Sequence, residues 1–182
     1  MTVREIVDLA AEELRIAKET TDYFNGSSTA GQAKAELLLT CYNLVENELA
    51  LDYFSLTKEE SVSSSGKVLF TALKNSPVRI LKVTDSNGQD LAYTLYPSYI
   101  EVRRGNVKIS YVYTPNVKAI DEECDFSGNV SARLMAFGIA AEYCMATGSF
   151  EESALWDKKY KDAIEAIREK SKGGRMALRR WA

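Results

Sequence analysis

The spacing at which apolar residues recur changes twice along the sequence. This change constrains the possible fold more than any other feature of the sequence. Up to about residue 60 and again after residue 117, apolar side chains recur every three or four residues, as on a helix with one buried stripe. Between residues 67 and 113, short segments rich in Val, Ile, Thr and Tyr alternate with polar residues, as half-buried strands do. The sequence therefore predicts an α+β protein with helices at both ends and strands between them.

Two helices are expected before residue 60. The first begins at a capping box of Thr2 and Glu5, in which each side chain satisfies a backbone amide, and it ends at Asn25. The second, from Ala30 to Phe54, has apolar residues around much of its girth, so we expect it to need partners on several sides, one of them in another subunit. The residues expected at that subunit interface are Leu38, Tyr42, Val45, Leu49 and Tyr53.

The middle of the chain predicts a small antiparallel sheet or sandwich. Ser61 to Gly66 is expected to be a flexible joint, because Ser and Gly disfavour regular structure. The short strands that follow leave no room for crossover helices, so neighbouring strands must be antiparallel. They are expected at residues 67–73, 78–83, 90–96, 98–103 and 107–113.

After an acidic loop at Asp121–Asp125, the apolar period is again helical. Gly148 marks a tight turn between two helices, which we expect to form an antiparallel hairpin. Gly138 lies inside the first of these helices and is interpreted as a site of close packing. The expected division is a helix pair at 1–60, a β-rich insert at 61–116, a hairpin at 117–170 that packs with 1–60 as an antiparallel helix bundle, and a basic tail at 171–182.

The tail is the sharpest charged feature of a chain whose net charge is only −3. From Lys170 to the end there are basic residues and no acidic one, so the remainder of the chain is more acidic than the net charge indicates. Arginine side chains, which can pair with carboxylates through two hydrogen bonds, and a large aromatic ring suit docking on an acidic protein surface. A solubilising end without a partner, and weak salt-sensitive nucleic-acid binding, remain open as alternatives. The docking candidates are Lys172, Arg175, Arg179, Arg180 and Trp181.

Little in the sequence points to catalysis or to a bound metal. The chain has no histidine, which is the commonest general base, and no phosphate-binding loop or nucleophile elbow. Cys41, Cys124 and Cys144 form no CxxC pair, so we expect reduced, buried thiols. The acidic loop matches no calcium-loop spacing. We therefore predict a protein that is not an enzyme, with no catalytic residues, cofactor or metal.

No segment is apolar enough to predict a membrane span, so we expect no membrane partner. The N-terminal sequence has neither the apolar core nor the cleavage site of a signal peptide. We therefore expect the chain to stay in the compartment where it is made.

Three stretches resemble the head–tail connector (adaptor) proteins of tailed bacteriophages. The opening helices VREIVDLAAEELRI and AELLLTCYNLVENELA have the layout of that family's N-terminal helix pair. The segment YIEVRRGNVKISYVYTPNVKAIDEECDF is similar to its last strands and the acidic loop after them. The stretch SARLMAFGIAAEYCMATGSFEESALWDKKYKDAIEAI resembles its C-terminal hairpin most strongly, and the chain ends in RRWA.

The resemblance implies a structural virion protein that forms a homo-oligomeric ring, commonly a dodecamer, beneath the portal protein. Expected partners are other copies of the chain, the portal, the next neck or tail protein, and passing double-stranded DNA that is not bound sequence-specifically. The expected location is the virion neck, with assembly in the host cytoplasm. An acidic body suits a channel through which DNA slides, because like charges do not adhere.

Two other functions remain possible on the sequence alone. One is a tail-completion or stopper protein lower in the neck. The other, of a different class, is a nucleic-acid-binding accessory module that acts through the basic tail.

Overall fold

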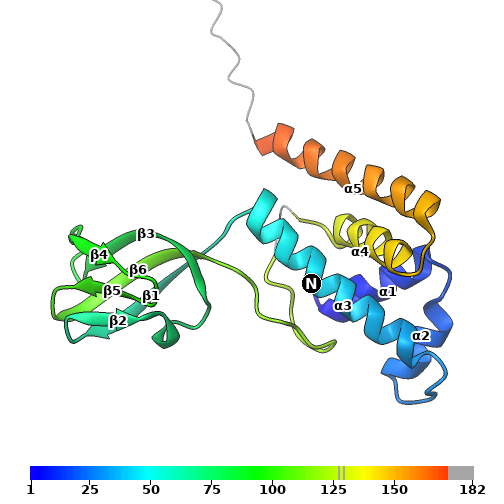
Figure 1. The fold of residues 1–182 in the computed structure, drawn as a ribbon, viewed down its shortest axis with the longest axis horizontal. Helices are drawn as coiled ribbons and strands as arrows, with labels where there is room; N and C mark the ends of the chain where they lie inside the picture. The colour runs from blue at the N-terminus through cyan, green and yellow to red at the C-terminus, as the bar shows by residue number, and fades with distance from the viewer. Residues whose placement is uncertain (127, 129, 172–182) are drawn as a thin grey trace, which may run out of the picture. The chain divides into compact units, whose positions relative to one another are not determined.

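The computed structural model describes residues 1–126, 128 and 130–171, and it combines helices with two small antiparallel sheets, confirming the α+β class. The chain divides into two compact units. The helical unit joins residues 1–45 to the chain from Lys118 onward, and the β unit is the whole of residues 46–117. Figure 1 shows the same order by colour, with blue, yellow and orange helices in one unit and green strands in the other. Residues 46–60, which we assigned to the N-terminal helix pair, belong to the β unit.

The first expected helix is in fact two helices. The capping box is confirmed, because the Thr2 hydroxyl accepts from the Glu5 amide at 3.2 Å and the Glu5 carboxylate accepts from the Thr2 amide at 2.8 Å. Arg15 has a φ of 60°, which no α-helix can contain, so the helix ends there and a new one begins. The helices are α1 (Val3–Glu13), α2 (Ala17–Phe24), α3 (Gln32–Glu48), α4 (Ala132–Ala146) and α5 (Phe150–Ser171), with a π-helical turn at Leu49–Tyr53 after α3.

Helix α4 is the central element of the helical unit. It packs against α1 and α5, and it is buried around most of its girth, as a helix with few charged residues must be. Figure 1 shows α4 between α5 and the blue helices. At Gly138 the neighbours approach so closely that a Cβ would lie 2.9 Å from Val45 Cγ1 on α3 and 2.9 Å from Tyr160 Cε2 on α5. The interpretation of Gly138 as a close-packing site is confirmed.

The β unit is a small sandwich with one core. Its sheets have the strand orders β1-β6-β3 and β2-β5-β4, and every pairing is antiparallel, as predicted. Val68 and Ile100 from one sheet pack in one cluster with Ile109 and Tyr111 from the other. The strands are β1 (Leu56–Ser64), β2 (Lys67–Leu69), β3 (Pro77–Asp85), β4 (Tyr93–Leu95), β5 (Tyr99–Val102) and β6 (Gly105–Tyr113).

The flexible joint expected at Ser61–Gly66 is wrong. Residues up to Ser64 form the second half of β1 and pair along β6 as far as Gly105. The Ser64 hydroxyl is buried, accepts from the Gly66 amide at 3.1 Å and lies 3.4 Å from the Val102 carbonyl. Gly66, at a φ of 110°, turns the chain into β2. Serines that disfavour regular structure locally are therefore held in a strand by pairing with β6 and by side-chain hydrogen bonds.

Gly138→Ala should destabilise the protein by about 1–2 kcal/mol, because overpacking outweighs the higher helix propensity of alanine. The added methyl group would meet Val45 and the Tyr160 ring at 2.9 Å. Urea unfolding of the purified variant measures the loss. In a Val45→Ala background the same substitution should cost less, because one of the two obstructing groups is gone. Equal costs in both backgrounds would contradict this packing account.

Asp85 should make the β unit sensitive to acid. Its buried carboxylate accepts from the Gln89 and Asn87 amides at 3.0 and 2.8 Å and pairs with Arg103 at 2.9 Å. The Gln89 amide is the largest influence, and with Asn87 and Arg103 it lowers the pKa of Asp85 below its ordinary value of 3.8, although burial opposes this. A lowered pKa in the folded state contributes stability above pH 3.8 that is lost as the pH falls through the folded-state pKa.

Asp85→Asn should therefore lower the urea midpoint at pH 7, and the gap from the unsubstituted protein should narrow toward pH 3. Asp90→Asn is the matched control, because Asp90 pairs only on the surface with Lys82, with side chains 74% and 55% exposed. An Asp85→Asn protein whose midpoint differs from the unsubstituted one by the same amount at both pH values would exclude this role.

Candidate functional site

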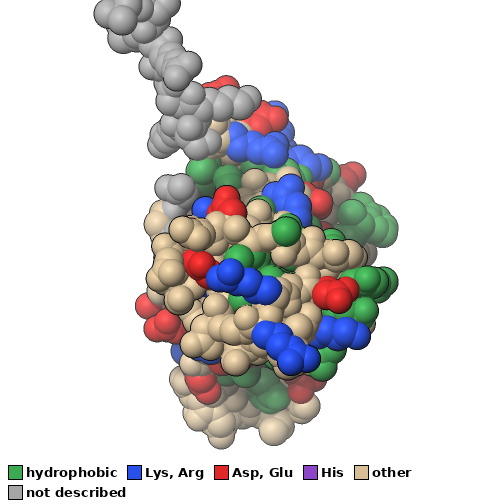
Figure 2. Space-filling model, turned by 90° about the vertical axis from the view of Figure 1, so that its left-hand side faces the viewer, with side chains coloured by type: hydrophobic (Ala, Val, Ile, Leu, Met, Phe, Trp, Pro, Cys, Tyr) green, Lys and Arg blue, Asp and Glu red, His purple; other side chains and the backbone are tan. Residues whose placement is uncertain are grey.

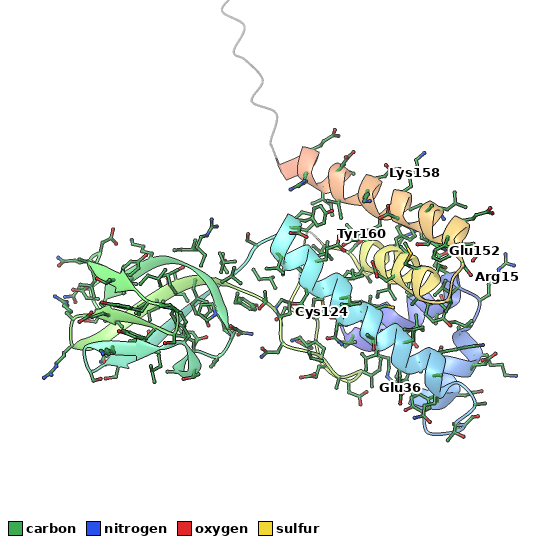
Figure 3. All side chains as sticks on the ribbon, in the orientation of Figure 1. Arg15, Glu36, Cys124, Glu152, Lys158 and Tyr160 are labelled. Atoms are coloured by element: carbon green, nitrogen blue, oxygen red, sulfur yellow. The ribbon has the colours of Figure 1, made fainter. Side chains whose placement is uncertain are left out.

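A groove of the helical unit lies between the end of α1 and α5. It has a volume of about 610 Å³. The left-handed residue Arg15 ends α1 at its rim, so Glu13, Leu14 and Arg15 form one wall. Figure 3 labels Arg15, Glu152 and Lys158 on the elements that form the groove. The residues contributed by α5 are Glu152, Leu155, Trp156, Lys158, Lys159 and Asp162.

Trp156 is the main aromatic surface of this groove. Its ring stacks on Phe137 of α4, with centroids 5.7 Å apart and an angle of 29° between the planes. The Lys159 ammonium lies 3.8 Å from the Trp156 centroid, which is close enough for a strong cation–π contact. The Trp156 ring is therefore fixed in orientation before anything binds.

Exposed apolar side chains gather where α4 turns into α5. Met145 is 54% exposed, and Phe150 and Leu155 are each 65% exposed. Exposed apolar side chains of this size can contribute to surfaces that contact another protein. With mixed charges and no enclosed cavity, this region is suited to protein contact.

The two buried thiols of this unit are held in their protonated, unreactive form. Burial raises the pKa of Cys41 to about 11, so its thiol is almost fully protonated at neutral pH. Burial also raises the pKa of Cys144, and the nearby Glu152 carboxylate adds to the effect. Among the residues with described positions, no group of three His, Cys, Asp or Glu side chains could hold a metal ion.

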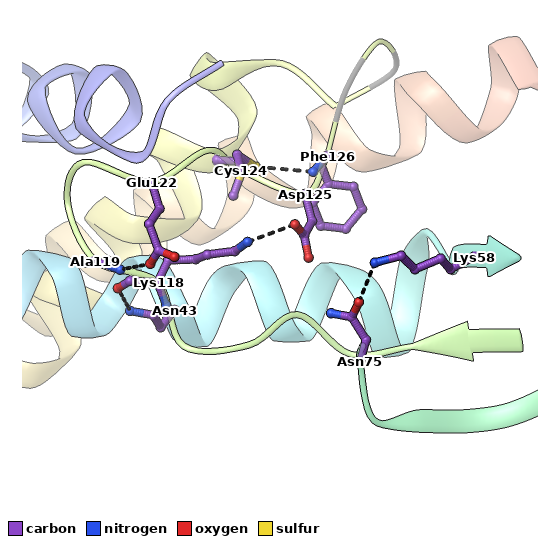
Figure 4. A network of polar contacts seen from close by, with 10 residues as sticks. Asn43, Lys58, Asn75, Lys118, Ala119, Glu122, Cys124, Asp125 and Phe126 are labelled. Carbon is purple, nitrogen blue, oxygen red and sulfur yellow. Dashed lines mark hydrogen bonds and ion pairs between the residues drawn. The ribbon is translucent and has the colours of Figure 1, made fainter. Parts of the chain in front are cut away.

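The acidic loop is held by its own contacts. Lys118 pairs with Asp125 at 2.8 Å, and the Glu122 carboxylate accepts from the Ala119 amide (Figure 4). The Asn43 side chain accepts from the Lys118 amide at 2.7 Å and donates to its carbonyl at 3.2 Å. These carboxylates therefore fix the path of the loop after Lys118.

The structure does not support the interface predicted on the second long helix. Leu38, Tyr42, Val45 and Leu49 have no exposed surface, and Tyr53 is half-buried. The four buried side chains are not available to a second subunit, contrary to the prediction. Most of the apolar face of α3 is used within the chain, as the contact of Val45 at Gly138 illustrates, and Leu44 is its large apolar residue that stays exposed, at 55%.

The predicted docking residues of the tail lie outside the described part of the chain: Lys172, Arg175, Arg179, Arg180 and Trp181. The groove at Trp156 was not predicted from the sequence. The sequence gives one signal of this groove. Leu155, Lys159 and Asp162 recur at helical spacing on α5, so an apolar residue and two charged residues lie on the same side of the helix.

No protein-family model matches the chain, and no curated protein matches it. None of the helices within the described ranges is long and apolar enough to cross a membrane.

The reactivity of the three cysteine thiols tests the burial described for the helical unit. In the folded protein, Cys41 and Cys144 should react slowly with an aromatic disulfide reagent at neutral pH, because both are buried with raised pKa values. The half-buried Cys124 should react first. All three should react quickly in denaturant. Cys124→Ser should remove the fast phase, and fast reaction of a second thiol in the folded state would contradict the burial described here.

Proposed function

We propose that this protein is a head–tail connector (adaptor) subunit of a tailed bacteriophage. The observation that carries the proposal is the chain order: both ends of the chain build one helical unit, and the β unit of residues 46–117 is inserted between them. This order, with a hairpin of α4 and α5 after the insert, is the layout that the sequence resemblance implies.

The proposal includes the finer arrangement of the helices, an antiparallel bundle of N-terminal and C-terminal helices. Supporting contacts run from α4 to α1, to α5 and, at Gly138, to Val45 of α3. A three-residue connection, Thr147–Ser149, joins α4 to α5. So short a connection leaves two packed helices antiparallel.

A ring needs two different surfaces on each subunit, because each copy contacts the next head to tail. With the α3 residues buried, the proposed ring contacts are the exposed apolar side chains on each unit. In the helical unit these include Leu44, Met145, Phe150 and Leu155, and in the β unit they include Leu69, Val78 and Leu95. Both units thus offer apolar surface suited to subunit contacts.

The charges on one face of the molecule favour this proposal over a nucleic-acid-binding surface on that face. Figure 2 shows Lys and Arg side chains interspersed with Asp and Glu on the face turned to the viewer. Several bases are also neutralised locally, as in the pairs Lys108–Glu59 and Lys82–Asp90 at 2.8 Å. Tight nucleic-acid binding requires a continuous basic stripe, which this face does not present. Passing DNA would therefore slide past without a specific site.

The proposal is tested by imaging the purified protein with and without the portal protein of the same phage. We expect rings of about twelve copies on the portal, since a closed ring is the stable product of head-to-tail contacts. Deleting residues 173–182 should leave the circular dichroism spectrum and the urea midpoint unchanged and abolish portal docking.

Three outcomes would count against the connector role. Binding to a tail-tube protein without portal binding would identify a stopper or tail-completion protein instead. Duplex DNA binding that weakens linearly with salt on logarithmic axes would identify the nucleic-acid module. Unchanged docking of the truncated chain would exclude the tail as the portal contact.

A further inference from the structure

Strand β4 has a free edge in the β unit. The sheet order β2-β5-β4 gives it one neighbour, β5, and no second strand partner among the residues that the structure describes. The Tyr96 amide donates to the Tyr99 carbonyl at 2.9 Å, and hydrogen-bonded pairs alternate along an antiparallel ladder. Thr94 therefore bonds to β5, whereas the N–H and C=O groups of Tyr93 and Leu95 point away from it.

The core of the β unit is uncovered along this edge. Leu95 lies opposite Ile100, so the two side chains project from the same face of the sheet. Ile100 is 1% exposed, but Leu95 is 58% exposed. The next pair on this face is the same, with Val102 buried and Tyr93 exposed. Core-facing side chains of β4 are thus exposed where one further strand would cover them.

A pocket of about 230 Å³ lies beside Leu95, between β4 and the first half of β3. Phe70 and Ile80 line it and also pack against the core of the β unit. Val78, another lining residue, is 55% exposed. Arg79 is the charged residue of the lining, and within the described ranges it forms no ion pair. The pocket is therefore suited to an apolar side chain with a carboxylate next to it.

Strand β4 carries few of the features that protect exposed strand edges. Charged side chains, proline and β-bulges commonly prevent an edge from pairing with another molecule. β3 begins with Pro77 and pairs with shifts in register, whereas β4 has the sequence Tyr-Thr-Leu and pairs with β5 without a shift. A length of three residues is its remaining protection. Main-chain pairing alone is therefore weak here, and the pocket must add to it.

We propose that β4 binds an extended segment of another protein by strand addition, and that this segment has apolar side chains at alternate positions and an acidic residue at one end. The segment runs antiparallel to β4 and pairs with the outward N–H and C=O groups of Tyr93 and Leu95. One of its apolar side chains enters the pocket, and its carboxylate pairs with Arg79. In this binding mode main-chain hydrogen bonds give affinity and the side-chain pocket gives specificity.

The inference goes beyond the connector role and does not rest on it, because every group involved belongs to the β unit. A segment bound here covers Leu95 and Val78, which leaves Leu69 to the ring contacts proposed above.

A single extended segment fits this edge better than β4 of a second copy. The pocket has β3 on its far side, so a strand added to β4 cannot bring another strand beside it. In a second copy, β4 comes with β5 attached. It would also offer Arg79 no carboxylate, since β4 has no acidic residue.

A short probe peptide tests the proposal on the full-length chain. The acetylated and amidated peptide Glu-Leu-Thr-Leu-Thr is designed to place its leucines opposite Leu95 and Tyr93 and its glutamate beside Arg79. In ¹⁵N-labelled protein with millimolar peptide, we expect the Tyr93 and Leu95 amide signals to move downfield and their hydrogen exchange to slow, because both amides gain an acceptor. The Thr94 amide, already bonded to β5, should change little.

N-methylated peptides separate strand addition from apolar contact alone. Methylating the two leucine amides removes the donors that face β4 and should weaken binding about fivefold for each lost hydrogen bond. Methylating the amide of the middle threonine, which faces away from β4, is the matched control and should leave the affinity nearly unchanged. Equal affinities of the two methylated peptides overturn the proposal.

Two pairs of protein variants test the pocket. Leu95→Lys should abolish the peptide-induced shifts, because it removes apolar contact and places a charge at the pocket. Leu69→Lys is its control, since Leu69 is 54% exposed on β2 and does not line the pocket. Arg79→Glu should weaken binding about two- to fivefold, and a peptide with lysine in place of glutamate should restore it. Arg104→Glu, outside this pocket, should have neither effect.

Two further results overturn the proposal. One is that neither the Tyr93 nor the Leu95 amide signal moves with millimolar probe peptide. The other is that both signals move with protein concentration when no peptide is present, which assigns the edge to a second copy. Portal docking in the imaging experiment above is independent of these results, so the failure of one proposal is distinguishable from the failure of the other.

Discussion

The helical unit depends on how closely other helices approach α4. At Gly138 both Val45 of α3 and Tyr160 of α5 occupy the space that any side chain would take. Interiors are packed at crystal-like density, so where two helices approach α4 this closely the residue at the contact must be small. The run of Gly138, Ala140 and Ala141 in α4 satisfies this requirement. Because α1 and α3 precede the β unit and α5 follows α4, contacts with this one helix join the two ends of the chain.

The β unit depends in the same way on one central element. In the sheet β1-β6-β3, strand β6 pairs with a strand on each side. Its pairing with β1 extends over all nine residues, Leu56 to Ser64, without a shift in register. Its pairing with β3 contains register shifts near Pro77 and Ile80. Bulges of this kind twist an edge strand and discourage pairing with another molecule. Polar contacts also lie inside this unit, where the Tyr111 hydroxyl donates to the largely buried Glu60 carboxylate.

The sequence predicted those features that local patterns determine. The capping box at Thr2, the glycine at position 138 and the antiparallel strands follow from spacing, side-chain size and turn residues, and the structure contains them. Features that depend on distant partners were missed. The Ser-rich end of β1 is a strand because β6 pairs with it, and nothing nearby in the sequence indicates this.

The error on α3 has a physical cause of the same kind. A wide apolar face shows that a helix is covered on several sides, but it does not show what covers it. Tyr42 and Val45 are covered within the chain, whereas Leu44 on the same helix is exposed, as are Phe150 and Leu155 on the charge-rich α5. Single exposed residues such as Leu155 leave no periodic signal. The groove beside Trp156 could not be predicted either, because it exists only where α1 ends against α5.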